Sequence, residues 1–284
     1  MSARNQVNAA GRAGRKPKLG QNFLVDLQAA RRVVEALGDI SNSVVIEIGP
    51  GRGALTKALA ERASRLVAVE FDRVLAEELS KDFAGKTTVE IVQANFLDTS
   101  LSELLTLGNS RPSQRAKVVG NIPYYITSDI LLRLFEQHEL VERIVVMVQR
   151  EVADRLVAEP GSRDYGLLTV TAKLFADIER LLTLPPSAFR PAPQVYSSVL
   201  RLAIAPKAEA LGVDSQKFLS FCKLAFAQKR KTLVNNLRRR FAVQQIRSVL
   251  QSAAVPDNVR AEALSLRQLA EIYRNLKPDP SQPN

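Results

Sequence analysis

A short stretch at residues 118–127, VVGNIPYYIT, combines residue types that could hold an amine on a flat ring. An apolar run ends at Asn121, and Ile122, Pro123 and Tyr124 follow it. Because Pro123 keeps the residue before it out of helical geometry, we expect the Ile122 carbonyl to lack a helix or sheet partner. The Asn121 amide oxygen is a second acceptor, and the Tyr124 ring is a flat stacking face. A packed loop without chemistry is the alternative.

An exocyclic amino group of adenine, cytosine or guanine fits such a pair of acceptors. Its lone pair is delocalised into the ring, so it becomes a good nucleophile only when its hydrogens are held and the nitrogen turns pyramidal. Stacking of the base on Tyr124 would contribute roughly 1–3 kcal/mol. The base has to be single-stranded or flipped out to fit. Asn121, Ile122, Pro123 and Tyr124 are therefore predicted to form a catalytic cradle for a base amine.

A glycine-rich turn, GPGRG, separates an apolar run from a helical pattern and indicates a ligand site. Gly49 and Gly51 permit positive φ and let a ligand approach the backbone at a helix N-terminus. Glu70 follows about 20 residues later, where an acid binds ribose hydroxyls. The Lys-Ser/Thr pair of a Walker A loop is missing, and the spacing G-x-G-x-G differs from the dinucleotide pattern. Glu47, just before the turn, can bind an ammonium group directly or through water.

Ribose binding and amino-acid binding together indicate S-adenosylmethionine as the cofactor, with a purely structural glycine turn as the alternative. In IVQANFLD, Asn95 can accept from the adenine amino group and Phe96 can pack on the ring. An ordinary loop asparagine is the alternative for Asn95. Methyl transfer from a sulfonium depends on positioning and needs no metal or covalent nucleophile. No metal site is expected, in agreement with a single histidine and a single cysteine.

The composition favours a polyanionic partner. The chain of 284 residues carries a formal net charge of +11, which favours nucleic acid over a small acidic substrate. A solvated basic surface is the alternative. The lone Cys222 excludes a disulfide framework and indicates a reducing compartment, so we expect a cytoplasmic location. No apolar run approaches the ~20 residues of a membrane span, and no membrane partner is expected.

The elements that must position these residues follow an alternating pattern. Short, β-branched runs typical of buried parallel strands alternate with helical spacing, at residues 44–48, 65–70, 88–92, 117–120 and 143–148. This order predicts an α/β fold with a doubly wound Rossmann-like sheet, which a strand-like run at residues 197–204 extends. Beyond residue 206 only helical patterns occur. We expect a flexible basic arm (1–18, with a transit peptide as the alternative), a methyltransferase domain (19–206) and a small helical RNA-binding domain (207–284).

The C-terminal part is basic over residues 215–256, which contain no Asp or Glu. Surface charges normally mix signs, so a stretch of one sign indicates phosphate contacts. Such contacts position RNA without reading its sequence. A solvated helix face is the alternative. The residues expected to bind RNA are Lys223, Lys229, Arg230, Lys231, Arg238, Arg239 and Arg240.

The NIPY motif at residues 121–124 resembles a signature of amino-group methyltransferases, in the form typical of the ribosomal RNA adenine N6-dimethyltransferase family. Other ordered segments resemble the same family: KPKLGQNFLVD, IEIGPGRGALT, VQREVADRLVAEPGSRDYGLLTV, FRPAPQVYSSVLRL and LAFAQKRKTLVNNL. The resemblance extends over residues 16–276. GQNFLVD and KRKTLVNNL favour the small-subunit (16S) group of this family, which is linked to kasugamycin sensitivity.

The resemblance implies a class I methyltransferase fold, S-adenosylmethionine, and dimethylation of two adjacent adenosines in a hairpin near the 3′ end of 16S rRNA. The partner would be that RNA within the small ribosomal subunit or its precursor, with a role in subunit biogenesis. We expect a monomer, because nothing in the sequence suggests an obligate oligomer. A large-subunit rRNA methyltransferase of the macrolide-resistance type and a non-catalytic assembly factor remain alternatives, and a nicotinamide-linked oxidoreductase is a more distant one.

The resemblance also implies roles for single residues. Positions that contact the cofactor in the family correspond to Asn22, Leu24, Gly49, Glu70, Asn95 and Asn121. Tyr124 corresponds to the stacking aromatic, and Phe189 to a second ring against the target base. Two positions depart from the family pattern, because Asn95 stands where an acid is usual and Tyr196 where an aspartate is usual. Neither departure lies in the NIPY cradle.

Overall fold

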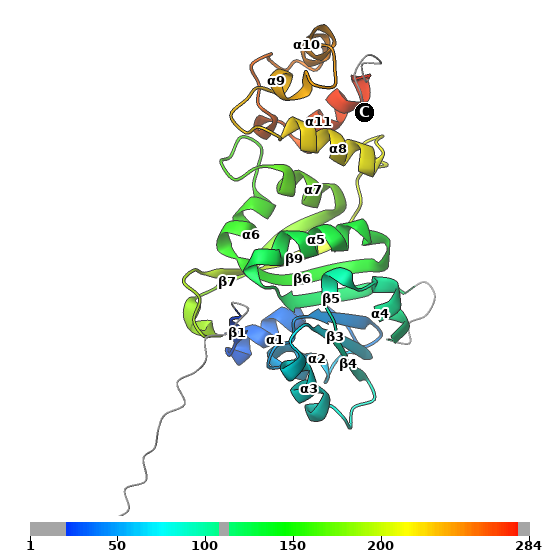
Figure 1. Cartoon of the computed structure of the whole chain (residues 1–284), viewed down its shortest axis with the longest axis vertical. Coiled ribbons are helices and arrows are strands. Elements are labelled where there is room, and N and C mark those ends of the chain that lie inside the picture. The colour runs from blue at the N-terminus through cyan, green and yellow to red at the C-terminus, as the bar shows by residue number, and fades with distance from the viewer. Residues whose placement is uncertain (1–20, 108–113, 278–284) are drawn as a thin grey trace, which may run out of the picture.

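Within the described residues, 21–107 and 114–277, seven strands form the central sheet of this computed structural model. The strands are β2 (Val44–Ile48), β3 (Arg65–Glu70), β4 (Val89–Gln93), β5 (Ala116–Asn121), β6 (Val141–Gln149), β7 (Ala176–Leu184) and β9 (Ser197–Ile204). Their order is β4-β3-β2-β5-β6-β9-β7 (Figure 1). The first five in this order run parallel, and β9 is antiparallel to both β6 and β7. The predicted basic arm, residues 1–18, lies outside the described residues.

The strand order creates a crevice at one edge of the sheet. From β2 the chain moves outward through β3 to β4, and it then returns to the other side of β2 with β5. Ligands of open α/β sheets bind where the order reverses in this way, outside the carboxyl ends of the strands. The predicted doubly wound sheet is confirmed, and β2, β3 and β9 have the predicted bounds.

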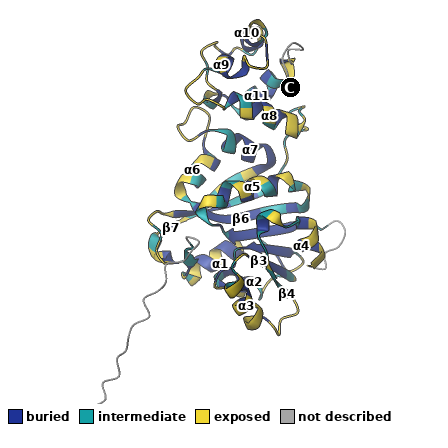
Figure 2. Ribbon diagram, in the orientation of Figure 1, coloured by how far each residue is buried: buried dark blue, intermediate teal, exposed yellow. Residues whose placement is uncertain are grey.

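Helices cover both faces of the sheet (Figure 2). They are α1 (Leu27–Glu35), α2 (Ala54–Leu59), α3 (Arg73–Asp82), α4 (Leu101–Leu107), α5 (Thr127–Glu136), α6 (Arg150–Val157) and α7 (Leu167–Phe175). Helices α1 to α3 share a hydrophobic cluster with Val45, whereas α4 to α7 share another with Ile46. Because successive side chains of a strand point to opposite faces, β2 is buried on both sides. This explains why its sequence is a continuous apolar run around one acid, Glu47.

A short strap, β1 (Phe23–Leu24), pairs antiparallel with β8 (Phe189–Arg190) in a separate two-stranded sheet. The Val25 N–H donates to the Ala188 carbonyl oxygen at 2.9 Å next to this pairing. Asp26 then caps α1 by accepting from two backbone N–H groups of its first turn. The sequence did not indicate the pairing, because strands of two residues carry no periodicity. The strap holds residues 22–24 at a fixed place in the fold.

Four helices follow the sheet: α8 (Ser215–Ala225), α9 (Leu233–Leu237), α10 (Val243–Ser252) and α11 (Leu266–Asn275). Helices α8 and α11 contact α7, so the four helices extend the molecule on the α7 side (Figure 1). One hydrophobic cluster runs from α5 and α7 into this part, where it includes Phe218 and Leu237. The division at residue 206 stays a proposal, and it falls between the end of β9 and the start of α8. In the part of the chain that the structure describes, none of the helices combines the length and hydrophobicity of a membrane span.

Candidate active site

A cavity of about 250 Å³ opens at the carboxyl ends of β2, β3 and β5, where the strand order reverses. Its wall is formed mainly by the last residues of these strands and the residues that follow them and β4, together with the strap. Every residue predicted to bind the cofactor lines this cavity: Asn22, Leu24, Glu47, Gly49, Gly51, Glu70, Asn95, Phe96 and Asn121. Ile122, Pro123 and Tyr124 line it as well. The fold therefore brings the cofactor candidates and the amine cradle into one space.

The glycine turn and Glu70 form one hydrogen-bonded unit. Oε2 of Glu70 accepts from the Gly51 N–H at 2.9 Å, and Oε1 accepts from the Asp72 N–H at 2.8 Å. Gly51 has a φ of 58°, and a Cβ there would lie 2.8 Å from Cδ1 of Phe23, so only glycine fits. Burial raises the pKa of Glu70, and the two backbone donors oppose this. A carboxylate accepts about four hydrogen bonds, so lone pairs of Glu70 remain for hydroxyl donors in the cavity.

Glu47 is a buried carboxyl group on the cavity wall. The residue is 1% exposed, and among the described residues its Oε2 has no hydrogen-bond partner. Burial, and in the same direction the carboxylate of Glu70, raise the pKa of Glu47 to about 8. An orphaned buried carboxyl group fits a cationic ligand, because an ammonium group would supply both the missing donor and the opposite charge.

Asn95 lies between β4 and a short 3₁₀ helix, η1 (Phe96–Asp98). Its Oδ1 caps η1 by accepting from the Leu97 N–H at 3.2 Å, and its Nδ2 donates to Oδ2 of Asp98 at 2.7 Å. Because an ionised carboxylate only accepts, this bond turns the amide nitrogen of Asn95 toward Asp98. Oδ1 is then the side-chain atom of Asn95 that can accept a further hydrogen bond from a ligand in the cavity.

Asn121 ends β5, and the strap holds its amide. Nδ2 donates to the backbone oxygen of Asn22 at 2.7 Å, which leaves Oδ1 as the acceptor. The Ile122 N–H donates to the Met147 oxygen of β6 at 3.2 Å. None of the backbone hydrogen bonds found in the described residues engages the Ile122 carbonyl oxygen. Two acceptors of neighbouring residues are thus present at the cavity, one from a side chain and one from the backbone.

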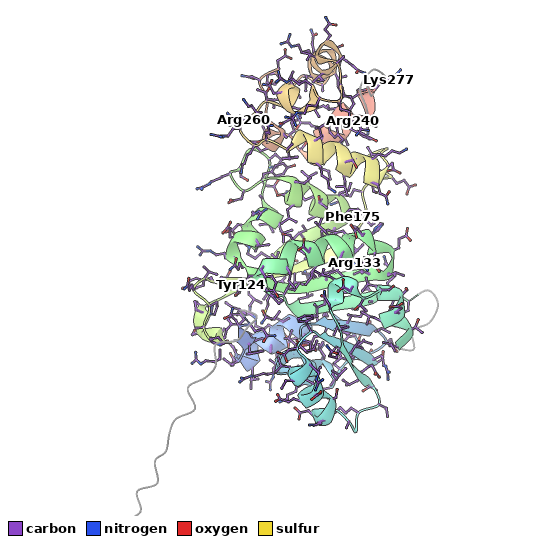
Figure 3. The ribbon with its side chains drawn as sticks, viewed as in Figure 1. Tyr124, Arg133, Phe175, Arg240, Arg260 and Lys277 are labelled. Atoms are coloured by element: carbon purple, nitrogen blue, oxygen red, sulfur yellow. The ribbon has the colours of Figure 1, made fainter. Side chains whose placement is uncertain are left out.

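Tyr124, labelled in Figure 3, is half-buried and begins the 3₁₀ helix η2 (Tyr124–Ile126). Its hydroxyl oxygen lies 2.9 Å from Oγ of Ser197, the first residue of β9. Burial raises the pKa of Tyr124, so the phenol is neutral at neutral pH. A ring that is held at its hydroxyl end and lines the cavity presents a stable face for stacking.

The sequence interpretation missed several residues of this site. Phe71 and Tyr125 line the cavity and are 57% and 67% exposed, which makes them large rings on its wall. The Arg52 guanidinium carbon lies 4.9 Å from the ring centroid of Phe23 in the strap. A Cβ on Gly120 would lie 2.6 Å from a backbone oxygen of β2, so glycine is needed where β2 and β5 approach. Phe71 and Tyr125 each directly follow a predicted site residue, and this position in the sequence could have indicated that they line the cavity.

Phe189 does not take the position expected of it. Its ring is 0% exposed, belongs to the hydrophobic cluster of α1 to α3, and is not part of the cavity wall. In β8 it pairs with Leu24, and its neighbour Arg190 takes the exposed side. A side chain alternates its direction along a strand, so this register turns the ring of Phe189 into the core. The predicted second stacking face is therefore corrected, because a buried ring has no face for a base.

The residues predicted to bind RNA phosphates lie on and between the C-terminal helices. All of them are exposed: Lys223, Lys229, Arg230, Lys231, Arg238, Arg239 and Arg240. Figure 3 shows Arg240 among these helices and well separated from Tyr124. Lys229 also donates to the Arg163 carbonyl oxygen at 2.6 Å, which ties this basic surface to the turn between α6 and α7. Their role in RNA binding stays a prediction.

The sheet and its cavity define the class of protein. A parallel sheet interrupted by one antiparallel strand, β9, which lies between β6 and the edge strand β7, with ligand groups at the carboxyl ends of β2, β3 and β5, is the arrangement of a Rossmann-like class I methyltransferase with a helical C-terminal part. The residues present fit S-adenosylmethionine, because Oε2 of Glu47, without a partner in the described part of the chain, suits an ammonium group and the anchored Glu70 suits ribose hydroxyls. Among the described residues, no cluster of His, Cys, Asp or Glu could hold a metal ion.

The chain belongs to the ribosomal RNA adenine dimethylase family, whose profile matches residues 13–277. A ribosomal RNA small subunit methyltransferase A from Koribacter versatilis is 53% identical and covers 93% of this chain and 95% of its own length. A relative of the same name from Acidobacterium capsulatum is 54% identical, and the match covers 92% of this chain and 91% of the relative. The crystal structure of 23S rRNA methyltransferase ErmE is 27% identical with a TM-score of 0.68, covering 90% of this chain and 99% of that chain. The protein is therefore an S-adenosylmethionine-dependent rRNA adenine methyltransferase.

Proposed function

We propose that this enzyme dimethylates N6 of two adjacent adenosines in a hairpin near the 3′ end of 16S rRNA during biogenesis of the small ribosomal subunit. The names of the two bacterial relatives support the small subunit as the source of the RNA. The observation that carries the chemistry is the pair of acceptors at Asn121 and Ile122 beside the Tyr124 ring. This substrate implies a cytoplasmic location, and we expect the enzyme to act as a monomer.

Residues of the cavity would hold the cofactor by its polar groups. Bound S-adenosylmethionine supplies an electrophilic methyl group on a sulfonium. Glu47 would pair with the ammonium group, and Glu70 would accept from the ribose hydroxyls. Oδ1 of Asn95 would accept from the adenine amino group, and Phe71 would cover the adenine ring.

The amine cradle would act on the target adenosine. The amide oxygen of Asn121 and the carbonyl oxygen of Ile122 would accept the two N–H groups of N6, which draws the nitrogen lone pair out of conjugation. The Tyr124 ring would stack on the adenine, with its hydroxyl held by Ser197. The strap would exclude water from the same space, since Phe23 lines the cavity and packs on Gly51. Positioning of this kind supplies much of the rate of a methyl transfer.

Transfer of labelled methyl groups tests the proposed substrate. Unmethylated small-subunit particles and naked large-subunit RNA would be offered in parallel, followed by nucleoside analysis. We expect label as N6,N6-dimethyladenosine in the small subunit alone. Label only in the large-subunit RNA would instead support a large-subunit methyltransferase, and the likeness to a 23S rRNA methyltransferase favours this alternative. No label, together with tight binding to the particle, would support a non-catalytic assembly factor.

The variant Asn121→Ala tests the cradle. Loss of one preorganised hydrogen-bonding group typically lowers kcat by about 10²–10³, and we expect a loss of this order. The dissociation constant for S-adenosylhomocysteine should change far less, because Glu47, Glu70 and Asn95 remain. Asn42→Ala, at an exposed asparagine remote from the cavity wall, is the matched control. Unchanged turnover in Asn121→Ala would remove the cradle assignment.

A further inference from the structure

Tyr196 and Arg150 form an exposed pair of an aromatic ring and a cation. Tyr196 is 48% exposed, and the guanidinium carbon of Arg150 lies 5.7 Å from its ring centroid. The backbone also joins the two residues, because the Arg150 N–H donates to the Tyr196 carbonyl oxygen at 3.0 Å. Neither residue lines the cavity, and the proposed reaction uses neither of them. Their side chains therefore need another explanation.

Strand register places this pair at the edge of the sheet that carries the amine cradle. Gln149, the last residue of β6, pairs with Ser197, the first residue of β9. Arg150 directly follows Gln149, and Tyr196 directly precedes Ser197. Because β5 and β6 are parallel, both residues lie where β5 also ends. Tyr196 is thus one residue, about 3.3 Å of extended chain, from Ser197, whose Oγ lies 2.9 Å from the Tyr124 hydroxyl.

Alternation along β9 indicates the side of the sheet on which Tyr196 lies. Leu200 and Leu202 belong to the hydrophobic cluster that continues through α5 and α7 into the C-terminal helices, whereas Val199 belongs to the cluster on the other face. Since successive side chains alternate, position 196 falls on the side of Leu200 and Leu202. The exposed basic residues predicted to bind phosphates lie on and between the C-terminal helices, which pack against α7 on this same side. An RNA that extends from those residues to the cradle would run along the side of the sheet on which Tyr196 lies.

We propose that Tyr196 and Arg150 form a subsite for the nucleotide next to the target adenosine, with its base stacked on the Tyr196 ring. The inference rests on the proposed function, because it takes single-stranded RNA as the substrate. An aromatic ring binds any base, since every base has a π-face. Arg150 adds a planar cation that can stack on the same base or reach the adjoining phosphate. A held neighbour would keep the target base displaced from its stack and in front of Tyr124.

A matched change in protein and RNA tests this subsite. The probe is a synthetic RNA hairpin with loop adenosines, bound in the presence of S-adenosylhomocysteine, with and without an abasic nucleotide on either side of the target. We expect Tyr196→Ala to raise the dissociation constant about tenfold. One of the abasic substitutions should have the same effect on the wild type and none on Tyr196→Ala. Independent effects of the two changes, or wild-type affinity in Tyr196→Ala, would overturn the proposal.

Two further variants separate stacking from charge and from folding. Tyr196→Phe keeps the ring and should bind RNA within about twofold of the wild type. Arg150→Gln should lose more affinity than Arg155→Gln, which removes the same charge from an exposed position of the same helix. Equal losses would remove Arg150 from the subsite. Affinity for S-adenosylhomocysteine should be unchanged in Tyr196→Ala, because this residue lies outside the cavity wall.

Methyl transfer to unmethylated small-subunit particles distinguishes a failure of this inference from a failure of the proposed function. Tyr196→Ala should raise KM more than it lowers kcat, because it removes a contact to the RNA and none to the reacting amine. A wild-type enzyme that transfers no methyl group to the particles would refute the proposed function. An active wild type that Tyr196→Ala equals in kcat and KM would refute the subsite alone.

Discussion

The Asn95–Asp98 pair allows a sharp test of how this site binds adenine. Nδ2 of Asn95 lies 2.7 Å from Oδ2 of Asp98, and its Oδ1 accepts from the Leu97 N–H at 3.2 Å. The variant Asn95→Asp keeps this cap, because aspartate and asparagine cap helices about equally well. It replaces the bond to Asp98, however, by two carboxylates that face each other. We predict that Asn95→Asp weakens cofactor binding, although it introduces the acid that is usual in the family.

The expected loss of cofactor affinity in Asn95→Asp follows from the repulsion between the two carboxylates. Two like unit charges about 4 Å apart repel by ~1 kcal/mol in water and by ~4 kcal/mol at an effective dielectric constant of 20. Asp98 is exposed and Asn95 is half-buried, so about 1–2 kcal/mol applies here. In the free variant the new carboxylate can turn away from Asp98, but the contact to adenine needs the present orientation of residue 95, so this repulsion opposes binding and the dissociation constant for S-adenosylhomocysteine should rise about 5- to 30-fold. The loss should shrink in high salt, which screens the two charges.

Calorimetry with S-adenosylhomocysteine on four proteins measures this prediction: the wild type, Asn95→Asp, Asp98→Asn and the double variant. The double variant reverses donor and acceptor, restores the bond and leaves an acceptor at position 95, so its affinity should return to within about threefold of the wild type. Asp82→Asn, at an exposed acid that ends α3, is the control for loss of charge. If Asn95→Asp binds as tightly as the wild type even at low salt, Asp98 does not orient Asn95 and the reasoning fails.

Three further predictions concern the cofactor contacts and the RNA surface. Because the pKa of Glu47 is raised to about 8, affinity for S-adenosylhomocysteine in calorimetry should increase as the pH rises toward that value, and Glu47→Gln should flatten this profile. The neutral carboxyl of Glu47 contributes stability that is fully present below the ordinary glutamate pKa of 4.5 and is lost as the pH rises to about 8, so the melting temperature of the ligand-free wild type should fall over this range, whereas that of Glu47→Gln should not. Gly51→Ala should abolish binding of S-adenosylhomocysteine, since a Cβ at this position would lie 2.8 Å from the Phe23 ring. Gly85→Ala, where a Cβ would have no neighbour within 4 Å, should bind S-adenosylhomocysteine normally. Arg230→Gln and Lys231→Gln should each lower the slope of log Kd against log salt for RNA by about 0.7–1, while a matched Lys57→Gln on α2 should leave it unchanged.

Local sequence patterns determined the sheet and the polar residues at the ends of its strands that line the cavity. Buried parallel strands require continuous β-branched runs that turn residues interrupt, so β2 and β3 could be read with their observed bounds, and the apolar run of the antiparallel β9 could be read in the same way. The carboxyl ends of parallel strands meet at one edge. The residues that end them, such as Glu70 and Asn121, therefore had to lie together whatever the details of packing.

Tertiary structure alone decided how the polar groups and rings of the site are turned. The amide of Asn121 is oriented by Asn22, which is 99 residues away in the sequence. Phe189 was expected to stack on the target base, yet pairing of the two-residue strand β8 with the strap buries its ring. Tyr196 meets Arg150 only through the register of β6 with β9. Such contacts join residues that are distant in the chain. They also depend on which side of a strand faces the core, and a strand as short as β8 carries no periodicity that would indicate that side.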